Sequence, residues 1–252
     1  MLNHTLDQIT DLKLHGLKAA LLEQLEQPGH YQELSFEERL SHLIDREALD
    51  RKNRKIKRLL AVSKLKYKDA FPGDIDYRTT RGLKKSLMTS LAQNHWLEHK
   101  QNVIITGPTG TGKTFLACAL AHQVLVSGYS VVYKRVSPLI AEIALVRADG
   151  TYLKWLKKLT RFQLLILDDL GLSSLTTLQA QELLEVVEER TQTGSIVVTS
   201  QLPVKEWYSY FNNPTLADAI MDRLIHNAHR IELKGESMRK VKNSVSLSDT
   251  LS

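Results

Sequence analysis

The sequence predicts an α/β fold, a three-layer sandwich around a parallel sheet of five strands, preceded by a small all-helical domain. Residues 107–114 read GPTGTGKT and match the phosphate-binding pattern G-x-x-x-x-G-K-[ST] between an apolar run and a helical pattern. From residue 102 onward, short apolar runs alternate with helical patterns, as in a doubly wound parallel sheet. The first 62 residues carry helical patterns only. These three observations define the predicted fold.

Residues 1–62 are expected to form a small helical domain. Leucine and isoleucine between Leu6 and Leu25 approximate one helical stripe, which Pro28 and Gly29 should end. Ser35 and Glu38 have the spacing of a capping box, so a second helix should begin there and continue into a basic stretch. The apolar stripe can pack internally or dock a partner, and the domain can serve partner binding, DNA binding or self-association.

The nucleotide-binding domain is expected to span residues 63–243. A turn over residues 70–74 and a helix over 83–99 should lead into it. Strands are predicted over 102–106, 130–135, 163–168, 195–200 and 229–233, and helices over 113–126, 137–147, 151–160, 176–191 and 214–226. Residues 244–252 should form a flexible tail.

Composition restricts the class of protein. Among 252 residues there is one cysteine, Cys118, so no disulfide can form within the chain, which fits a reducing cytoplasm. No apolar run approaches the ~20 residues that a membrane-spanning helix needs, so no membrane partner is expected. The net charge of +6 is unevenly distributed, which favours a polyanionic partner.

The phosphate loop predicts a site for ATP and Mg²⁺. Its glycines let backbone N–H groups converge on an anion at a helix N-terminus. Lys113 can reach the β- and γ-phosphates, and the Thr114 hydroxyl can ligate Mg²⁺. The predicted nucleotide-binding residues are Gly107, Pro108, Thr109, Gly110, Thr111, Gly112, Lys113, Thr114 and Phe115.

Two further strand ends supply candidate catalytic groups. Asp168 and Asp169 follow the run LLIL, where Asp168 can hold the Mg²⁺ shell. Asp169 can polarise the attacking water, or it can be the N-cap of the turn that follows. Thr199 and Ser200 end the next strand, and the carboxyl ends of parallel strands line the ligand crevice. One of these hydroxyls can position the water, although threonine and serine often end strands without such a role.

Two basic clusters are candidate DNA contacts. From Arg51 to Lys68 there are nine lysines or arginines and no acidic residue, and the candidates there are Arg51, Lys52, Arg54 and Lys55. The second cluster places Lys154, Lys157, Lys158 and Arg161 on one helical face, with Arg147 nearby. Both clusters suit sequence-independent contacts with the phosphates of duplex DNA. The alternative for each is an ordinary solvated helix face.

The segments GPTGTGKT, LLILDDLG, VVTSQLP, MDRLIHNAHRIEL and LKGESMR together resemble the IstB-type transposition helper ATPases. That family belongs to the AAA+ class and is related to the DnaC helicase loaders. The resemblance is strong over residues 60–243 and looser before them. It implies an ATPase that oligomerises on duplex DNA and assists the transposase of its insertion sequence in target selection.

The resemblance also implies roles for single residues. It matches Lys113 to the loop lysine, Asp168 and Asp169 to the catalytic acidic pair, and Ser200, with Thr199 beside it, to a phosphate sensor. It matches Arg223 to an arginine finger that reaches the nucleotide of a neighbouring subunit, and Arg239 to a second sensing arginine. Without the family, Arg223 would be read as a surface arginine. Many AAA+ proteins carry glutamate at the position of Asp169, and many have a helical lid for which too few residues follow Arg239.

Two other functions use the same loop. A DnaC-like loader would grip a replicative helicase with its N-terminal helices instead of a transposase. A monomeric small-molecule kinase would need an acceptor pocket and a lid, for which no segment is long enough, and it would have no use for the basic stretch.

Overall fold

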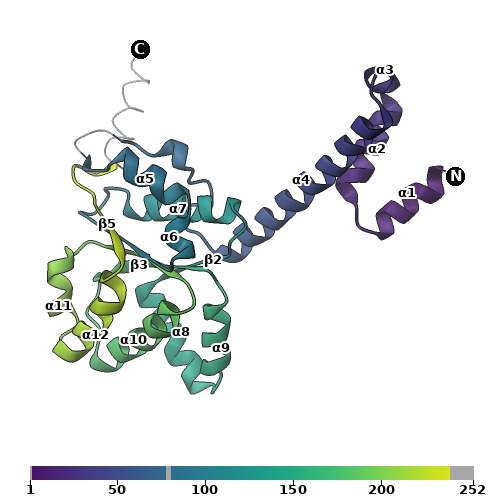
Figure 1. The fold of residues 1–252 in the computed structure, drawn as a ribbon. Coiled ribbons are helices and arrows are strands. Elements are labelled where there is room, and N and C mark those ends of the chain that lie inside the picture. Colours follow the sequence, from purple (N-terminus) through teal and green to yellow (C-terminus); the bar gives the residue numbers. More distant parts are fainter. Residues whose placement is uncertain (1, 78–80, 239–252) are drawn as a thin grey trace, which may run out of the picture. The chain divides into compact units, whose positions relative to one another are not determined.

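The structure is a computed structural model that describes residues 2–77 and 81–238. Contacts between residues divide the chain into two units, Met1–Arg58 and Leu59–Ser252, with the boundary inside helix α4 (Phe36–Ser63) (Figure 1). The domain boundary expected after residue 62 stays a prediction, and residues 239–252, with Arg239 and the expected tail, lie outside the described residues. Among the described helices, none has both the length and the apolar character needed to span a bilayer.

The first unit consists of helices α1 (Leu2–Asp11), α2 (His15–Glu26), α3 (Pro28–Tyr31) and the first part of α4. The single helix predicted between Leu6 and Leu25 is wrong. Lys13 adopts a left-handed φ of 58°, which separates α1 from α2. Pro28 starts α3 at a position where its missing N–H is tolerated. The capping box is confirmed, since the Glu38 N–H donates to Ser35 Oγ at 3.2 Å and the Ser35 N–H to Glu38 Oε2 at 2.8 Å.

The second unit contains a five-stranded parallel sheet, as predicted. The strands are β1 (Asn102–Thr106), β2 (Val131–Arg135), β3 (Leu164–Leu170), β4 (Ser195–Ser200) and β5 (Ala228–Glu232). Their order is β2-β3-β4-β1-β5, so β1 lies between β4 and β5, and β4 lies between β1 and β3. The loop after β1 therefore meets the carboxyl ends of β3 and β4 at one edge of the sheet.

Helices cover both faces of the sheet, which gives the predicted three layers (Figure 1). One core contains α5 (Lys85–Ala92), α6 (His95–Glu98) and α7 (Lys113–Val126). The other contains α8 (Val136–Ala148), α9 (Tyr152–Thr160), α10 (Thr177–Thr191) and α12 (Pro214–Ile225). Successive side chains of β1 point to opposite faces of the sheet, so Val103 and Ile105 pack in the first core and Ile104 packs in the second.

Three local features differ from the prediction. The helix expected over 83–99 is divided into α5 and α6 by Asn94, whose φ is 61°. Residues 204–210 form a 3₁₀ turn η3 (Val204–Glu206) and helix α11 (Trp207–Tyr210) where no element was predicted. The turn predicted over residues 70–74 is confirmed, because a 3₁₀ turn η1 spans Pro72–Asp74. Strand β3 extends to Leu170 with a shifted register, and Asp169 within it has a φ of 63°.

Candidate nucleotide-binding site

The phosphate loop joins β1 to α7 and requires glycine at defined positions. Gly107 and Gly110 have φ values of 147° and 84°. A Cβ atom on Gly107 would lie 2.3 Å from the Leu233 carbonyl oxygen, and one on Gly110 would lie 2.2 Å from Ser237 Oγ. Both the backbone conformation and the close approach of residues 233–237 therefore exclude a side chain at these positions.

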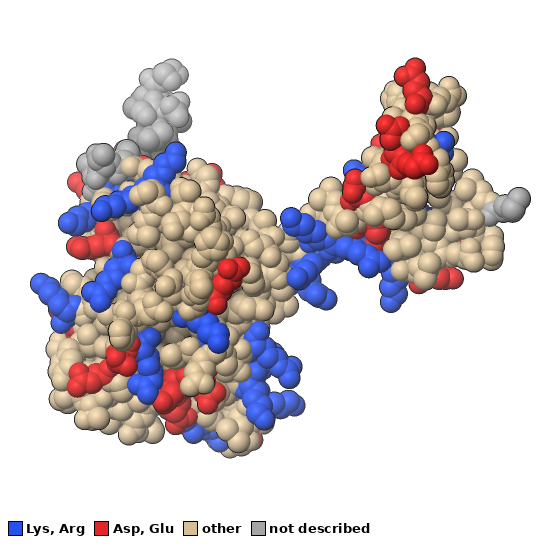
Figure 2. All heavy atoms as spheres, in the orientation of Figure 1, with Lys and Arg blue, Asp and Glu red and all other residues tan. Residues whose placement is uncertain are grey.

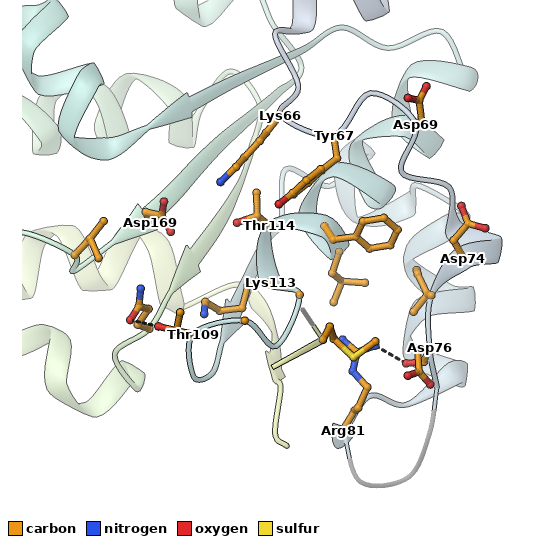
Figure 3. Close-up of a pocket in the computed structure, with 18 residues that line it drawn as sticks. Lys66, Tyr67, Asp69, Asp74, Asp76, Arg81, Thr109, Lys113, Thr114 and Asp169 are labelled. Atoms are coloured by element: carbon orange, nitrogen blue, oxygen red, sulfur yellow. Dashed lines mark hydrogen bonds between the residues drawn. The ribbon is translucent and has the colours of Figure 1, made fainter. Parts of the chain in front are cut away.

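The loop borders a cavity of about 640 Å³ (Figure 3). That volume lies in the range of small-molecule sites. The predicted residues that line it are Thr109, Gly110, Gly112, Lys113, Thr114 and Phe115, and Asp169 joins them from β3. Gly107, Pro108 and Thr111 do not line it. The carbonyl groups of Gly107 and Pro108 accept hydrogen bonds from Lys113 of the loop, and that of Thr111 accepts one from Arg81.

Lys113 is buried at the base of the loop. Its Nζ donates to the carbonyl oxygens of Gly107 at 2.8 Å and Pro108 at 2.9 Å. Burial lowers the pKa of Lys113, while the negative charges of Asp169 and Asp168 act in the opposite direction. An ammonium group has three donors, so this arrangement leaves capacity for a phosphate oxygen.

Asp168 is fully buried and does not line the cavity, and it accepts hydrogen bonds from three hydroxyl groups. Thr199 Oγ1 donates to its Oδ1 at 2.6 Å, and the Tyr133 hydroxyl to its Oδ2 at 2.6 Å. Thr114 Oγ1 donates to its Oδ1 at 2.9 Å. Burial, together with the bond to Asp168 and its charge, raises the pKa of Tyr133. Carboxylate and hydroxyl oxygens are ligands that suit Mg²⁺, so the two predicted metal ligands, Thr114 and Asp168, fit that ion.

Asp169 lines the cavity, whereas the two predicted hydroxyls of β4 do not. The Asp169 N–H donates to Thr199 Oγ1 at 3.0 Å, and Arg135 Nε lies 3.8 Å from Asp169 Oδ2. Ser200 Oγ donates to the Leu170 carbonyl at 2.7 Å and accepts from the Leu202 N–H, so it joins β3 to β4. The alternative N-cap role for Asp169 in the following turn is not observed among the described residues. The Leu172 N–H donates to the Asp169 carbonyl oxygen at 3.4 Å, whereas the carboxylate faces Arg135.

Gln201 reaches the cavity where Ser200 does not. Its Oε1 accepts a hydrogen bond from Thr109 Oγ1 at 2.7 Å (Figure 3). Gln201 directly follows Thr199 and Ser200 at the carboxyl end of β4. The prediction that polar residues at this strand end line the site would have included it if extended by one residue. The direction in which the chain leaves the strand decides which of these residues faces the ligand, and the sequence does not specify that direction.

Arg81 is a second residue that sequence reasoning missed. Its guanidinium donates to the Thr111 carbonyl at 2.6 Å and to the Asp76 carbonyl at 2.6 Å. Its own carbonyl accepts from the Lys234 N–H at 2.9 Å. Arg81 thus ties the loop both to the segment that precedes the sheet and to the exit of β5. It lies thirty positions before Thr111 in a connecting segment, where no local pattern marks it.

Arg223 lies on α12 and does not line this cavity. Its NH2 donates to Glu188 Oε1 at 2.7 Å, and its NH1 to the Ala219 carbonyl at 2.9 Å. It borders a separate open hollow along α12. Arg223 is therefore not brought to the nucleotide cavity of its own chain.

The basic face of α9 is exposed and unpaired within the described part of the chain. Leu156 and Leu159 bury the opposite face, and Lys and Arg side chains gather over α9 (Figure 2). No described carboxylate forms an ion pair with the four predicted residues, Lys154, Lys157, Lys158 and Arg161. Arg147 differs from them. It pairs with Glu182 at 3.3 Å and Glu185 at 2.5 Å and lies 3.9 Å from the centre of the Tyr152 ring.

The basic stretch of α4 is partly paired. Arg51 Nε lies 2.6 Å from Glu47 Oε1, and Arg54 Nε lies 2.8 Å from Asp50 Oδ2. Lys52 and Lys55 are exposed, and over residues 2–77 and 81–238 no ion pair involves them. Of the four predicted contacts in this stretch, the two lysines are therefore those with uncommitted charge.

Solved structures share this fold. The chain superimposes on a DnaC helicase loader with a TM-score of 0.51 at 19% identity, over 62% of this chain and 95% of that one. It superimposes on AMPPCP-bound DnaA from Aquifex aeolicus with a TM-score of 0.57 at 16% identity, over 72% of this chain and 55% of that one. At such identities the likeness concerns the fold, which is the one expected of the AAA+ class.

Sequence relatives cover almost the whole chain. A Sinorhizobium fredii protein named as insertion sequence ATP-binding protein y4pL is 44% identical over 95% of this chain and 98% of its own length. One named as the ATP-binding protein of insertion sequence IS1162 from Pseudomonas fluorescens is 41% identical over 81% of this chain and 87% of its own length. The family described as IstB-like ATP binding protein matches residues 7–246. The resemblance seen in the sequence is thereby confirmed, and the chain belongs to the IstB-like ATP-binding protein family.

Proposed function

We propose that this chain is an ATPase that oligomerises on duplex DNA and assists the transposase of an insertion sequence in target selection. One observation carries the enzymatic part of the proposal. A phosphate loop, a buried carboxylate held by three hydroxyl groups and a second carboxylate that lines the cavity meet at one sheet edge. A protein that only bound ATP would not need the second carboxylate there.

Each residue of the site then has a task. The loop N–H groups and Lys113 would hold the phosphates, while Thr114 and Asp168 would hold Mg²⁺. When bound, that ion bridges phosphate oxygens and neutralises their charge. Asp169 would orient the attacking water, and its short side chain is placed by the positive φ within β3. Thr199, which bonds both aspartates, would keep their spacing fixed.

Among the described residues of a single chain, no arginine with an uncommitted guanidinium group lines the cavity. Arg81 donates to carbonyl groups, and Arg223 is directed toward α10 on a different surface. An arginine finger contributes about 10³–10⁵-fold to hydrolysis in GTPases. We infer that Arg223 of one copy completes the site of the next, so that hydrolysis depends on oligomerisation. The exposed basic face of α9 supports the DNA part of the proposal, because lysines that form no ion pair with a described carboxylate suit phosphate contacts.

Light scattering combined with size-exclusion chromatography tests the proposal as a whole. The protein is measured alone, with ATP and Mg²⁺, with duplex DNA, and with both. We expect the mass to rise to a defined oligomer with ATP and DNA together, and ATPase activity per mole to rise with protein concentration. A mass that stays monomeric in all four conditions, with activity strictly linear in concentration, would contradict it.

A DnaC-like helicase loader is the second candidate. The DnaC and DnaI structures support it, at 19% identity each and TM-scores of 0.51 and 0.55. The insertion-sequence relatives are more than twice as similar in sequence and cover more of the chain. A pull-down with the purified transposase and, in parallel, with the replicative helicase separates the two candidates.

A further inference from the structure

The nucleotide cavity contains a lysine outside the phosphate loop. Lys66 lies in the segment that follows α4, and its side chain points into the cavity toward the side where Thr114 and Asp169 lie (Figure 3). We propose that Lys66 binds the polyphosphate chain of the nucleotide and supplies a second cation from the same chain as the loop. The proposal rests on the nucleotide function proposed above and deepens it.

The main chain around Lys66 is held against α7, the helix that begins at the loop. Leu65 and Ala70 are 3% and 0% exposed in the core that contains α7. The Tyr67 ring packs on Phe115 with centroids 6.1 Å apart, and the Phe71 ring packs edge-on against His122 at 4.4 Å. The backbone of Lys66 is therefore anchored on both sides, and its long side chain extends over the cavity from a fixed origin.

No carboxylate of the described residues neutralises the charge of Lys66 in an ion pair. The Lys66 ammonium lies 5.7 Å from the centre of the Tyr67 ring. The two other cations that line the cavity are engaged, since Arg81 donates to two carbonyl oxygens and Lys113 to two more. Of the three lining cations, Lys66 is the one with no hydrogen-bond acceptor among the residues that the structure describes.

The charge balance of the cavity lining favours an additional cation near the phosphates. Its charged lining side chains are three basic, Lys66, Arg81 and Lys113, and four acidic, Asp69, Asp74, Asp76 and Asp169. A nucleoside triphosphate brings several negative charges into this lining, and a bound Mg²⁺ offsets only two of them. A lysine beside Thr114 and Asp169 reduces the repulsion where phosphate and carboxylate charges come together.

Lys68 provides a matched control. It lies on the same segment two residues later, is exposed, and borders a neighbouring hollow instead of the nucleotide cavity. Removing either lysine changes the net charge of the protein by the same amount. A long-range charge effect would therefore appear in both variants, whereas a direct contact would appear only at Lys66.

The test compares the wild-type protein with Lys66→Ala, Lys66→Arg and Lys68→Ala. Isothermal titration calorimetry measures the affinities for ATP, ADP and AMP with Mg²⁺ present, and thermal unfolding checks that each variant folds. We expect Lys66→Ala to weaken ATP about ten-fold, as for one charge-assisted hydrogen bond at a partly solvated site, and AMP less than two-fold. Lys66→Arg should recover most of the ATP affinity, and Lys68→Ala should bind like the wild type.

Equal affinities of Lys66→Ala and the wild type for ATP would overturn the proposal. So would an equal loss for ATP and AMP, or an equal loss in Lys68→Ala. A wild-type protein that does not bind ATP would instead refute the nucleotide function itself. The two failures are thus distinguishable.

Discussion

The Tyr133 hydroxyl donates to Asp168 across the strands β2 and β3, and we expect its removal to affect both stability and metal use. The bond is 2.6 Å long and joins two buried groups. Tyr133→Phe keeps the ring and creates no cavity, while Asp168 keeps its bonds from Thr199 and Thr114. A hydrogen bond to a charged group contributes about 1.5–3 kcal/mol. At about 2–4 °C per kcal/mol for a domain of this size, that corresponds to a loss of about 3–12 °C in Tm.

The functional effect should concern Mg²⁺ more than the nucleotide. With one restraint on Asp168 gone, the Mg²⁺ concentration that half-saturates ATP binding should rise several-fold, and kcat should fall about ten-fold. ATP affinity measured with EDTA should stay the same, because the loop is untouched. Tyr129→Phe is the control, since it removes the same atom from an exposed bond of 3.2 Å to Glu98. If Tyr133→Phe has the same Tm and the same Mg²⁺ requirement as Tyr129→Phe, the claim that the Tyr133 hydroxyl restrains Asp168 is wrong.

Three further perturbations follow from the geometry. Gly110→Ala should weaken ATP binding at least about ten-fold, because its Cβ would lie 2.2 Å from Ser237 Oγ. Gly150→Ala is the control, since Gly150 has a φ of 66° and no atom within 4 Å of such a Cβ, so it should show only the cost of backbone strain. Equal ATP binding by the two variants would contradict the steric argument. Arg190→Met should lower the free energy of unfolding, measured in urea, by about 3–5 kcal/mol, because the buried guanidinium donates to five carbonyl oxygens. A loss of less than about 1 kcal/mol would contradict the stabilising role of these hydrogen bonds. Charge reversal on α9 should weaken duplex DNA binding and reduce its salt dependence without changing ATP affinity, and unchanged DNA affinity would refute the contact. The residues changed to glutamate are Lys154, Lys157 and Lys158.

The sequence predicts the parts of this molecule that local patterns determine. Eight consecutive residues define the phosphate loop, and runs such as LLIL mark buried strands. The order of the strands in the sheet was not predicted, since consecutive strands such as β1 and β2 are not neighbours. Helix breaks at Lys13 and Asn94 escape prediction, because each depends on one left-handed residue whose cost of about 1 kcal/mol is met by tertiary packing.

The site was less predictable than the fold, because contacts between distant segments decide it. Both hydroxyls of β4 were expected near the ligand, yet the irregular end of β3 turns Thr199 and Ser200 toward β3 itself. Arg81 and Tyr133 reach the loop and Asp168 from segments about thirty positions away. Only the packed sheet brings such residues together, so no spacing along the chain reveals them.

A mixing experiment tests the central claim, that two copies share one active site. Lys113→Ala removes the loop lysine and Arg223→Ala removes the proposed finger, so each variant alone should have almost no ATPase activity on DNA. In a one-to-one mixture, random assembly would pair an intact loop with an intact finger at about a quarter of the interfaces. We predict recovery toward about a quarter of wild-type activity per mole of protein. A mixture no more active than the mean of the two separate variants would contradict the claim.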